Sequence, residues 1–149
     1  MERTSRRVST AVFILYCLGV LFLLFYRSPS DPSLPFPVYL RDHLNLVPFR
    51  TIRRFSRLLI PPVRPYLVRI ALRNLLGNIL LFVPLGFFLP RLFSLLRSFL
   101  LTVLSVCVMV CSVEILQVLF TVGTCDIDDL ILNLLGASFG YGIYKLTAK

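Results

Sequence analysis

Blocks of apolar residues, each close to the length needed to cross a bilayer, constrain this chain more than any other feature. They cover residues 8–26, 75–89, 99–120 and 130–146, and the second is the shortest. A helix rises ~1.5 Å per residue, so about 20 apolar residues cross the ~30 Å hydrocarbon core of a membrane. A helix also pairs its backbone polar groups within one segment, as that core requires. The sequence therefore predicts an all-α, polytopic membrane protein with four transmembrane helices.

The composition excludes an ordinary soluble domain. Apolar residues make up 57% of the 149 residues, and the mean hydropathy is +0.85. A soluble chain of this length could not bury so much apolar surface. Lys and Arg number 16 against 7 Asp and Glu, which gives a net charge of +9. Such a surplus is typical of nucleic-acid binders and of proteins at anionic membranes. Because the apolar blocks favour the second class, we expect membrane lipids as partners and no nucleic acid.

The cysteines indicate neither a metal centre nor a disulfide framework. Cys17, Cys107 and Cys111 lie inside apolar segments, where a thiol behaves as a small hydrophobic group. Cys125 lies in a loop, and the single histidine, His43, is far from all four in sequence. We therefore expect no metal and no cofactor.

A basic segment stands between the first two apolar blocks. It follows a stretch whose prolines exclude a helix at its start, at positions Pro29, Pro32, Pro35 and Pro37. Four arginines then recur at helical spacing, with Ile52, Phe55 and Leu59 on the opposite face: Arg50, Arg53, Arg54 and Arg57. This pattern predicts a short amphipathic helix at the lipid interface, with guanidinium groups among lipid phosphates. The alternative is a solvated surface helix.

Seven polar side chains lie inside or at the edge of the predicted spans, where they are costly unless paired. They are Asn78, Glu114, Gln117, Asp126, Asp128, Asp129 and Asn133. We expect Glu114, Gln117 and Asn133 to turn inward and meet Asn78, forming a binding cluster. The alternatives are amides that hold helices together, an N-cap at Asp126, and Asp128 and Asp129 favoured by a helix dipole.

Catalytic chemistry has two candidates, Glu114 and Asp129. An unpaired carboxylate at Glu114 would be expensive, so we expect it to be hydrogen-bonded, hydrated or protonated. The Asp126–Asp129 string could hold a divalent cation together with a lipid phosphate. The sequence contains no G-x-S-x-G, H-E-x-x-H or P-loop motif.

These motifs, taken in order, resemble the VanZ-like family. The resemblance is carried by Asn45-Leu-Val-Pro-Phe49, by Asn78-Ile-Leu-Leu-Phe-Val-Pro84-Leu-Gly86, by Glu114-Ile-Leu-Gln117, and by Asp126-Ile-Asp-Asp129 with Asn133 and Gly136. It implies a multi-pass protein of a bacterial cell membrane. It also divides the chain into an N-terminal helix with a Pro-rich loop, residues 1–44, and a VanZ-like membrane domain, residues 45–146. The family's namesake confers low-level resistance to the glycopeptide antibiotic teicoplanin.

Three functions are compatible with these observations. In the first, the protein is not an enzyme, and its polar cluster and basic helix bind a lipid headgroup, a cell-wall precursor or a glycopeptide. In the second, it is a structural or accessory membrane subunit whose amides pack helices. In the third, it is a membrane-embedded enzyme acting on a phospho- or peptidyl-lipid through Glu114 and the aspartates. We favour the first.

Overall fold

The computed structural model describes residues 2–26, 34–62 and 64–148 and confirms an all-α architecture. Pro29 and Pro32 lie outside the described residues. The long helices are α1 (Glu2–Phe25), α4 (Pro65–Leu92), α5 (Phe99–Leu119) and α6 (Ile127–Thr147). The short elements are α2 (Phe36–His43), β1 (Leu44–Asn45), α3 (Arg50–Arg57), η1 (Ser94–Arg97) and β2 (Cys125–Asp126).

Among the described residues, three helices are long and apolar enough to cross a membrane: Arg6–Phe25 of α1, all of α4 and all of α5. The expected fourth span, α6, has sufficient length at 21 residues. It is not among these three helices, and its apolar run is interrupted by Asp128, Asp129, Asn133 and Lys145. The fourth crossing therefore stays a prediction.

Two helices differ from the sequence-based expectation, and proline explains both differences. We expected Pro35 and Pro37 to exclude a helix, yet α2 begins directly after Pro35 and contains Pro37 in its first turn. The first backbone N–H groups of a helix have no partner within it, so proline is tolerated there. Pro65 likewise opens α4 ten residues before the apolar block that we assigned to the second span. Exposed arginines occupy that additional length.

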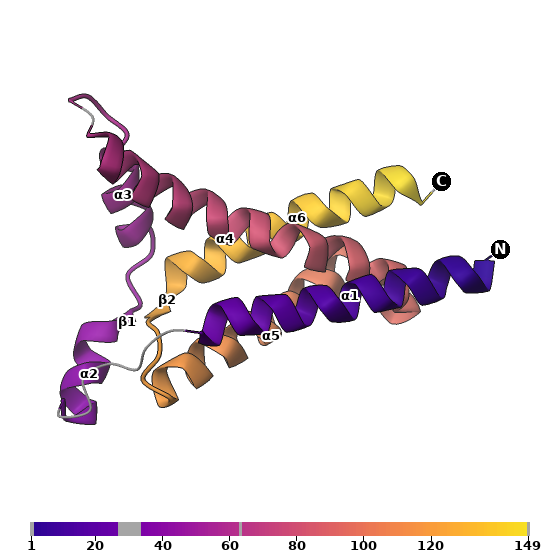
Figure 1. Cartoon of the computed structure of the whole chain (residues 1–149), viewed down its shortest axis with the longest axis horizontal. Coiled ribbons are helices and arrows are strands. Elements are labelled where there is room, and N and C mark those ends of the chain that lie inside the picture. The colour runs from indigo at the N-terminus through magenta and orange to yellow at the C-terminus, as the bar shows by residue number, and fades with distance from the viewer. Residues whose placement is uncertain (1, 27–33, 63, 149) are drawn as a thin grey trace.

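The four long helices lie side by side, with both termini at one end (Figure 1). The opposite end carries α2, α3, the two strands and the first turn of α6, and is called the motif end below. The strands form one short parallel pair, in which Leu44 lies opposite Cys125 and Asn45 lies opposite Asp126. This pairing joins the segment after α2 to the start of α6.

Helices α4 and α6 form the central contact of the bundle, and glycine allows their close approach. A Cβ atom at Gly136 would lie 2.1 Å from the backbone oxygen of Ile79, and one at Gly140 would lie 1.9 Å from that of Val83. From the other side, a Cβ at Gly86 would lie 1.9 Å from the backbone oxygen of Ala137. The sequence spacing of Gly136 and Gly140 is therefore used for backbone-to-backbone packing.

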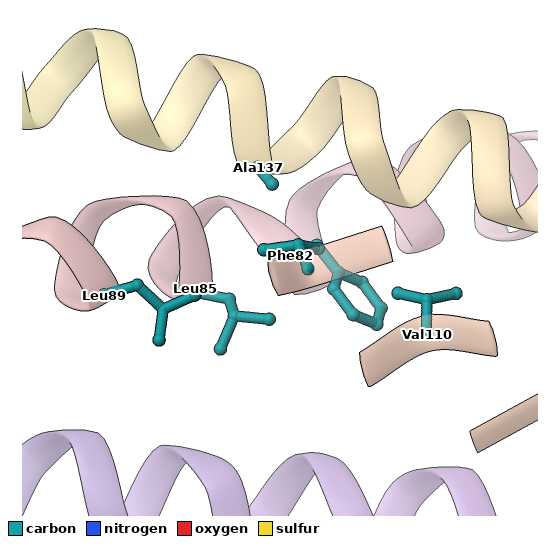
Figure 2. Close-up of a cluster of buried hydrophobic side chains, with 6 residues drawn as sticks. Phe82, Leu85, Leu89, Val110 and Ala137 are labelled. Atoms are coloured by element: carbon teal, nitrogen blue, oxygen red, sulfur yellow. The ribbon is translucent and has the colours of Figure 1, made fainter. Parts of the chain in front are cut away.

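The hydrophobic core lies beside this contact. Phe82, Leu85 and Leu89 follow one side of α4, and Val110 of α5 and Ala137 of α6 approach them (Figure 2). Helix α1 attaches to this core through polar contacts as well, because the Tyr16 hydroxyl donates to the backbone oxygen of Leu81 at 2.6 Å. These contacts hold the long helices in a fixed arrangement and so position the motif end.

Candidate functional site

The motif end brings together two sequence motifs that are far apart in the chain. The Asn45–Phe49 motif leads into α3, and the Asp126–Asp129 motif opens α6. Strand pairing aligns them, and Asn45 Nδ2 donates to Asp126 Oδ1 at 3.0 Å. The candidate site is therefore built around the junction of these two segments.

Asp128 is fully buried and supplies the N-terminal cap of α3. Its Oδ1 accepts from Phe49 N at 2.5 Å, and its Oδ2 accepts from Thr51 N at 2.6 Å and Ile52 N at 3.0 Å. The local N-cap residue, Phe49, offers no side-chain cap and has a left-handed backbone with φ of 64°. A carboxylate satisfies unpaired N–H groups and interacts favourably with the positive end of a helix. Asp128 thus holds α3 against α6.

Asp126 caps α6 and reaches α3 at the same time. Its Oδ1 accepts from Asp128 N at 2.9 Å, which confirms the N-cap alternative for this residue. Its Oδ2 accepts from the Thr51 hydroxyl at 2.5 Å. The backbone N–H of Asp126 donates to Glu114 Oε2 at 3.3 Å, so the carboxylate of α5 joins the network.

The remaining aspartate links α4 to α6. Asn78 Nδ2 donates to Asp129 Oδ1 at 2.5 Å. Asn133, one turn beyond Asp129, is buried, and its Oδ1 finds no donor among the described residues. An intramembrane amide bonded to a carboxylate of a neighbouring helix stabilises their packing.

Glu114 and Gln117 turn inward from α5 as expected, with 8% and 5% of their surfaces exposed. The hydrogen-bond acceptor of Gln117 differs from the predicted one. Gln117 Nε2 donates to the backbone oxygen of Leu24 in α1 at 2.7 Å, whereas we expected it to meet Asn78. The amides of Asn78 and Gln117 therefore serve two different helix contacts, α4 with α6 and α5 with α1.

The four arginines of α3 are all exposed. They are Arg50, Arg53, Arg54 and Arg57. Ile52 and Phe55, on the opposite face, are half-buried, and α3 packs against α4 and α6. Ile52 and Phe55 of the expected apolar face therefore contact protein, whereas Leu59 lies beyond the end of α3 and is exposed. Whether this helix lies in a lipid interface stays a prediction.

A divalent-cation site at the aspartate string has little support from this geometry. Within the described part of the chain, no group of three or more His, Cys, Asp and Glu side chains is arranged to hold a metal ion. Asp126 and Asp128 also direct their oxygens at N–H and O–H donors of the chain itself. A cation would have to displace those donors.

Sequence reasoning missed two residues of this network. Thr51 was not singled out, although its hydroxyl and its N–H both contact aspartates of the other motif. Tyr39 of α2 is buried, and its hydroxyl donates to the backbone oxygen of Gly123 in the loop before β2. Tyr39 and His43 are four residues apart, so a helix places them on one face, and their rings stack in the structure. This spacing was a local signal for an ordered helix.

Comparison with known proteins identifies the family. The sequence profile of the VanZ/LLP1 family matches residues 13–148, nearly the whole chain. The chain belongs to the VanZ-like family. It is 27% identical over 142 residues to Protein VanZ of Enterococcus faecium, covering 95% of this chain and 76% of that protein. No solved structure matches it. With three apolar helices among its described residues, this VanZ-like chain is a membrane protein.

The Cys125 thiol gives a pH-dependent test of the motif end. Burial raises the pKa of this thiol above its usual value of 9.0, and the nearby carboxylate of Glu114 raises it further. Only the thiolate reacts with iodoacetamide, so a raised pKa lowers the reactive fraction at neutral pH. With the other three cysteines replaced by alanine, we expect slow labelling at pH 7.5 and a continued rise in rate above pH 9.

A cysteine at the exposed neighbour Thr124 is the matched control for this experiment. Thr124→Cys, with Cys125 replaced by serine, is expected to label faster at pH 7.5 and to level off at lower pH. Equal rates and equal pH profiles at the two positions would contradict the burial of Cys125 beside carboxylates.

Proposed function

We propose that this VanZ-like protein is not an enzyme and binds an anionic group at the membrane surface. The group is a phosphate-bearing lipid headgroup or a cell-wall precursor. Its capture by the protein would change how a glycopeptide such as teicoplanin acts on the cell envelope. The family resemblance supports the link to glycopeptides, and the exposed basic helix supports the anionic ligand. We further propose that the protein is multi-pass and resides in the bacterial cell membrane.

One observation carries the proposal: Asp126 and Asp128 of the motif end are buried, and the arginines of α3 are exposed. Asp128 and Asp126 direct their carboxylates at the N-terminus of α3 and at Thr51. The guanidinium groups of Arg53, Arg54 and Arg57 are exposed. Guanidinium binds phosphate through paired N–H···O bonds, so a rigidly held arginine helix suits a phosphate-bearing ligand.

The contacts of these polar residues favour a structural role over a catalytic one. Asn78 bonds to Asp129, and Gln117 bonds to a backbone oxygen of α1. These are the contacts expected of the accessory-subunit alternative as well. In our proposal the same residues keep the bundle and α3 in place, so a packing role for the amides is compatible with ligand binding at the arginines.

Teicoplanin susceptibility tests the proposal. We expect expression in a susceptible Gram-positive host to raise the inhibitory concentration of teicoplanin. The triple variant Arg53→Lys/Arg54→Lys/Arg57→Lys keeps the charge that sets membrane orientation but loses the bidentate geometry. Loss of one bidentate guanidinium–phosphate contact, about 1.4 kcal/mol, weakens ligand binding roughly tenfold. We therefore expect most of the rise in the inhibitory concentration of teicoplanin to disappear.

The control is Arg91→Lys/Arg97→Lys, which changes two exposed arginines in the last turn of α4 and in η1, far along the chain from α3. We expect this variant to behave as the native protein when membrane levels are matched. An unchanged inhibitory concentration with the native protein present in the membrane would overturn the proposal. So would an equal loss in both variants.

A further inference from the structure

A short turn at the motif end exposes apolar side chains outside the long helices. Leu46, Val47 and Phe49 lie between β1 and α3 and are 61%, 57% and 49% exposed. Single exposed apolar residues are common, but three within four positions form a patch that water solvates poorly. Such a patch points to an apolar partner.

Hydrogen bonds from inside the protein hold this turn in its outward conformation. Strand pairing fixes Asn45 at its start, and Val47 N donates to Asn45 Oδ1 at 3.4 Å. Asp128 binds Phe49 N at its end, where the backbone is left-handed. Polar groups thus face inward and apolar side chains face outward. A preorganised surface of this kind binds without an additional cost of ordering.

Exposed arginines follow the turn directly, beginning at Arg50. An apolar tip flanked by guanidinium groups matches the chemistry of an anionic lipid surface, with acyl chains beneath a layer of phosphates. The apolar face of α3 cannot supply the tip, because Ile52 and Phe55 are half-buried and α3 packs on α4 and α6. Figure 1 places α3 and β1 together at the end of the bundle away from both termini.

We propose that the turn Leu46–Phe49 inserts into the acyl layer of an anionic membrane leaflet, with the α3 arginines at its phosphates. The inference deepens the proposed function and rests on the same basic helix. It adds a defined lipid-contacting segment and a defined depth. The turn then acts as an anchor that keeps the arginines at the level of the lipid headgroups.

The chain contains no tryptophan, so one introduced indole reports depth without background. We would reconstitute Val47→Trp in vesicles of phosphatidylglycerol and phosphatidylcholine whose acyl chains carry bromine at shallow or deep positions. We expect strong quenching by shallow bromine and little quenching by aqueous iodide. Val108→Trp, exposed in the middle of α5, is the control for deep quenching. Leu46→Trp provides a second reporter should Val47→Trp fold poorly.

Vesicles of phosphatidylcholine alone test the contribution of the arginines, and we expect at least twofold weaker quenching at Val47→Trp in them. An indole quenched by iodide and not by bromine lies in water, and one quenched by neither lies against protein. Either result would overturn the inference. This test does not depend on teicoplanin. If bromine quenching is lost but the protein still changes teicoplanin susceptibility, only the membrane anchor is disproved. If quenching is observed but susceptibility does not change, only the proposed function is disproved.

Discussion

Replacing Gly86 by alanine is expected to force α4 away from α6, whereas the same change at Gly77 in the same helix is expected to be tolerated. The added Cβ at Gly86 would lie 1.9 Å from the backbone oxygen of Ala137 and 2.6 Å from its carbonyl carbon. A backbone cannot rotate away as a side chain can, so the helices must separate and the core between them must open. At Gly77 a Cβ would meet nothing within 4 Å.

Thermal unfolding in detergent measures the difference. Overpacking costs roughly 3 kcal/mol when backbones must shift, which lowers the melting temperature by about 10 °C in a chain of this size. Gly136→Ala is expected to behave like Gly86→Ala, because its Cβ would lie 2.1 Å from the backbone oxygen of Ile79. Gly142→Ala is the matched control in α6, where no atom lies within 4 Å. Equal melting temperatures for Gly136→Ala and Gly142→Ala would disprove the packing.

Local patterns predicted the individual helices but not their partners. Hydropathy located α5 closely, because that helix is apolar along nearly its whole length, but it missed the polar first turns of α1, Glu2–Arg7. It shortened α4, because Arg69 and Arg73 interrupt the apolar run while lying on exposed positions of the helix. Gly136 and Gly140 lie four residues apart, a spacing that lets two helices approach closely, and α4 is the helix that approaches them. The third glycine of this contact, Gly86, comes from a distant segment, and no local pattern identifies such a partner.

For the polar residues too, the sequence predicted the local environment but not the interaction partners. Their burial could be predicted, because a bilayer penalises exposed polar groups within the spans. Their hydrogen-bond partners could not be predicted, because they are distant in the sequence. Asp128, for example, accepts a hydrogen bond from the backbone N–H of Thr51, 77 residues away. The acidic string looked like a cation or substrate site because carboxylates in series suit that role. Asp128 instead accepts from backbone N–H groups at the start of α3, and Asp126 accepts from Asn45 and Thr51, contacts that join two segments distant in the sequence.

Replacing Asp128 by alanine is expected to release α3 from the bundle. The change removes the acceptor of three backbone N–H groups and leaves those of Phe49, Thr51 and Ile52 without a partner. Hydrogen bonds to a charged group contribute about 1.5–3 kcal/mol each, so the cost of opening α3 should fall by roughly 3 kcal/mol or more. Asp128→Asn is also expected to release it, because its amide presents an N–H group where a second acceptor is needed.

Limited trypsin digestion measures this release, because trypsin cleaves after arginine and α3 contains four of them. Cleavage requires local opening, and its rate follows the population of the open state, so roughly 3 kcal/mol corresponds to about 100-fold faster cleavage. Asp42→Asn, an exposed acid of α2, is the control and should keep the native rate. The long helices should melt at nearly the native temperature in all three variants, because Gly86, Gly136 and Gly140 form their central contact independently of α3. A native cleavage rate in Asp128→Ala would show that α3 is held by its apolar face alone, and the inward-facing carboxylate would then no longer account for the outward-facing arginines.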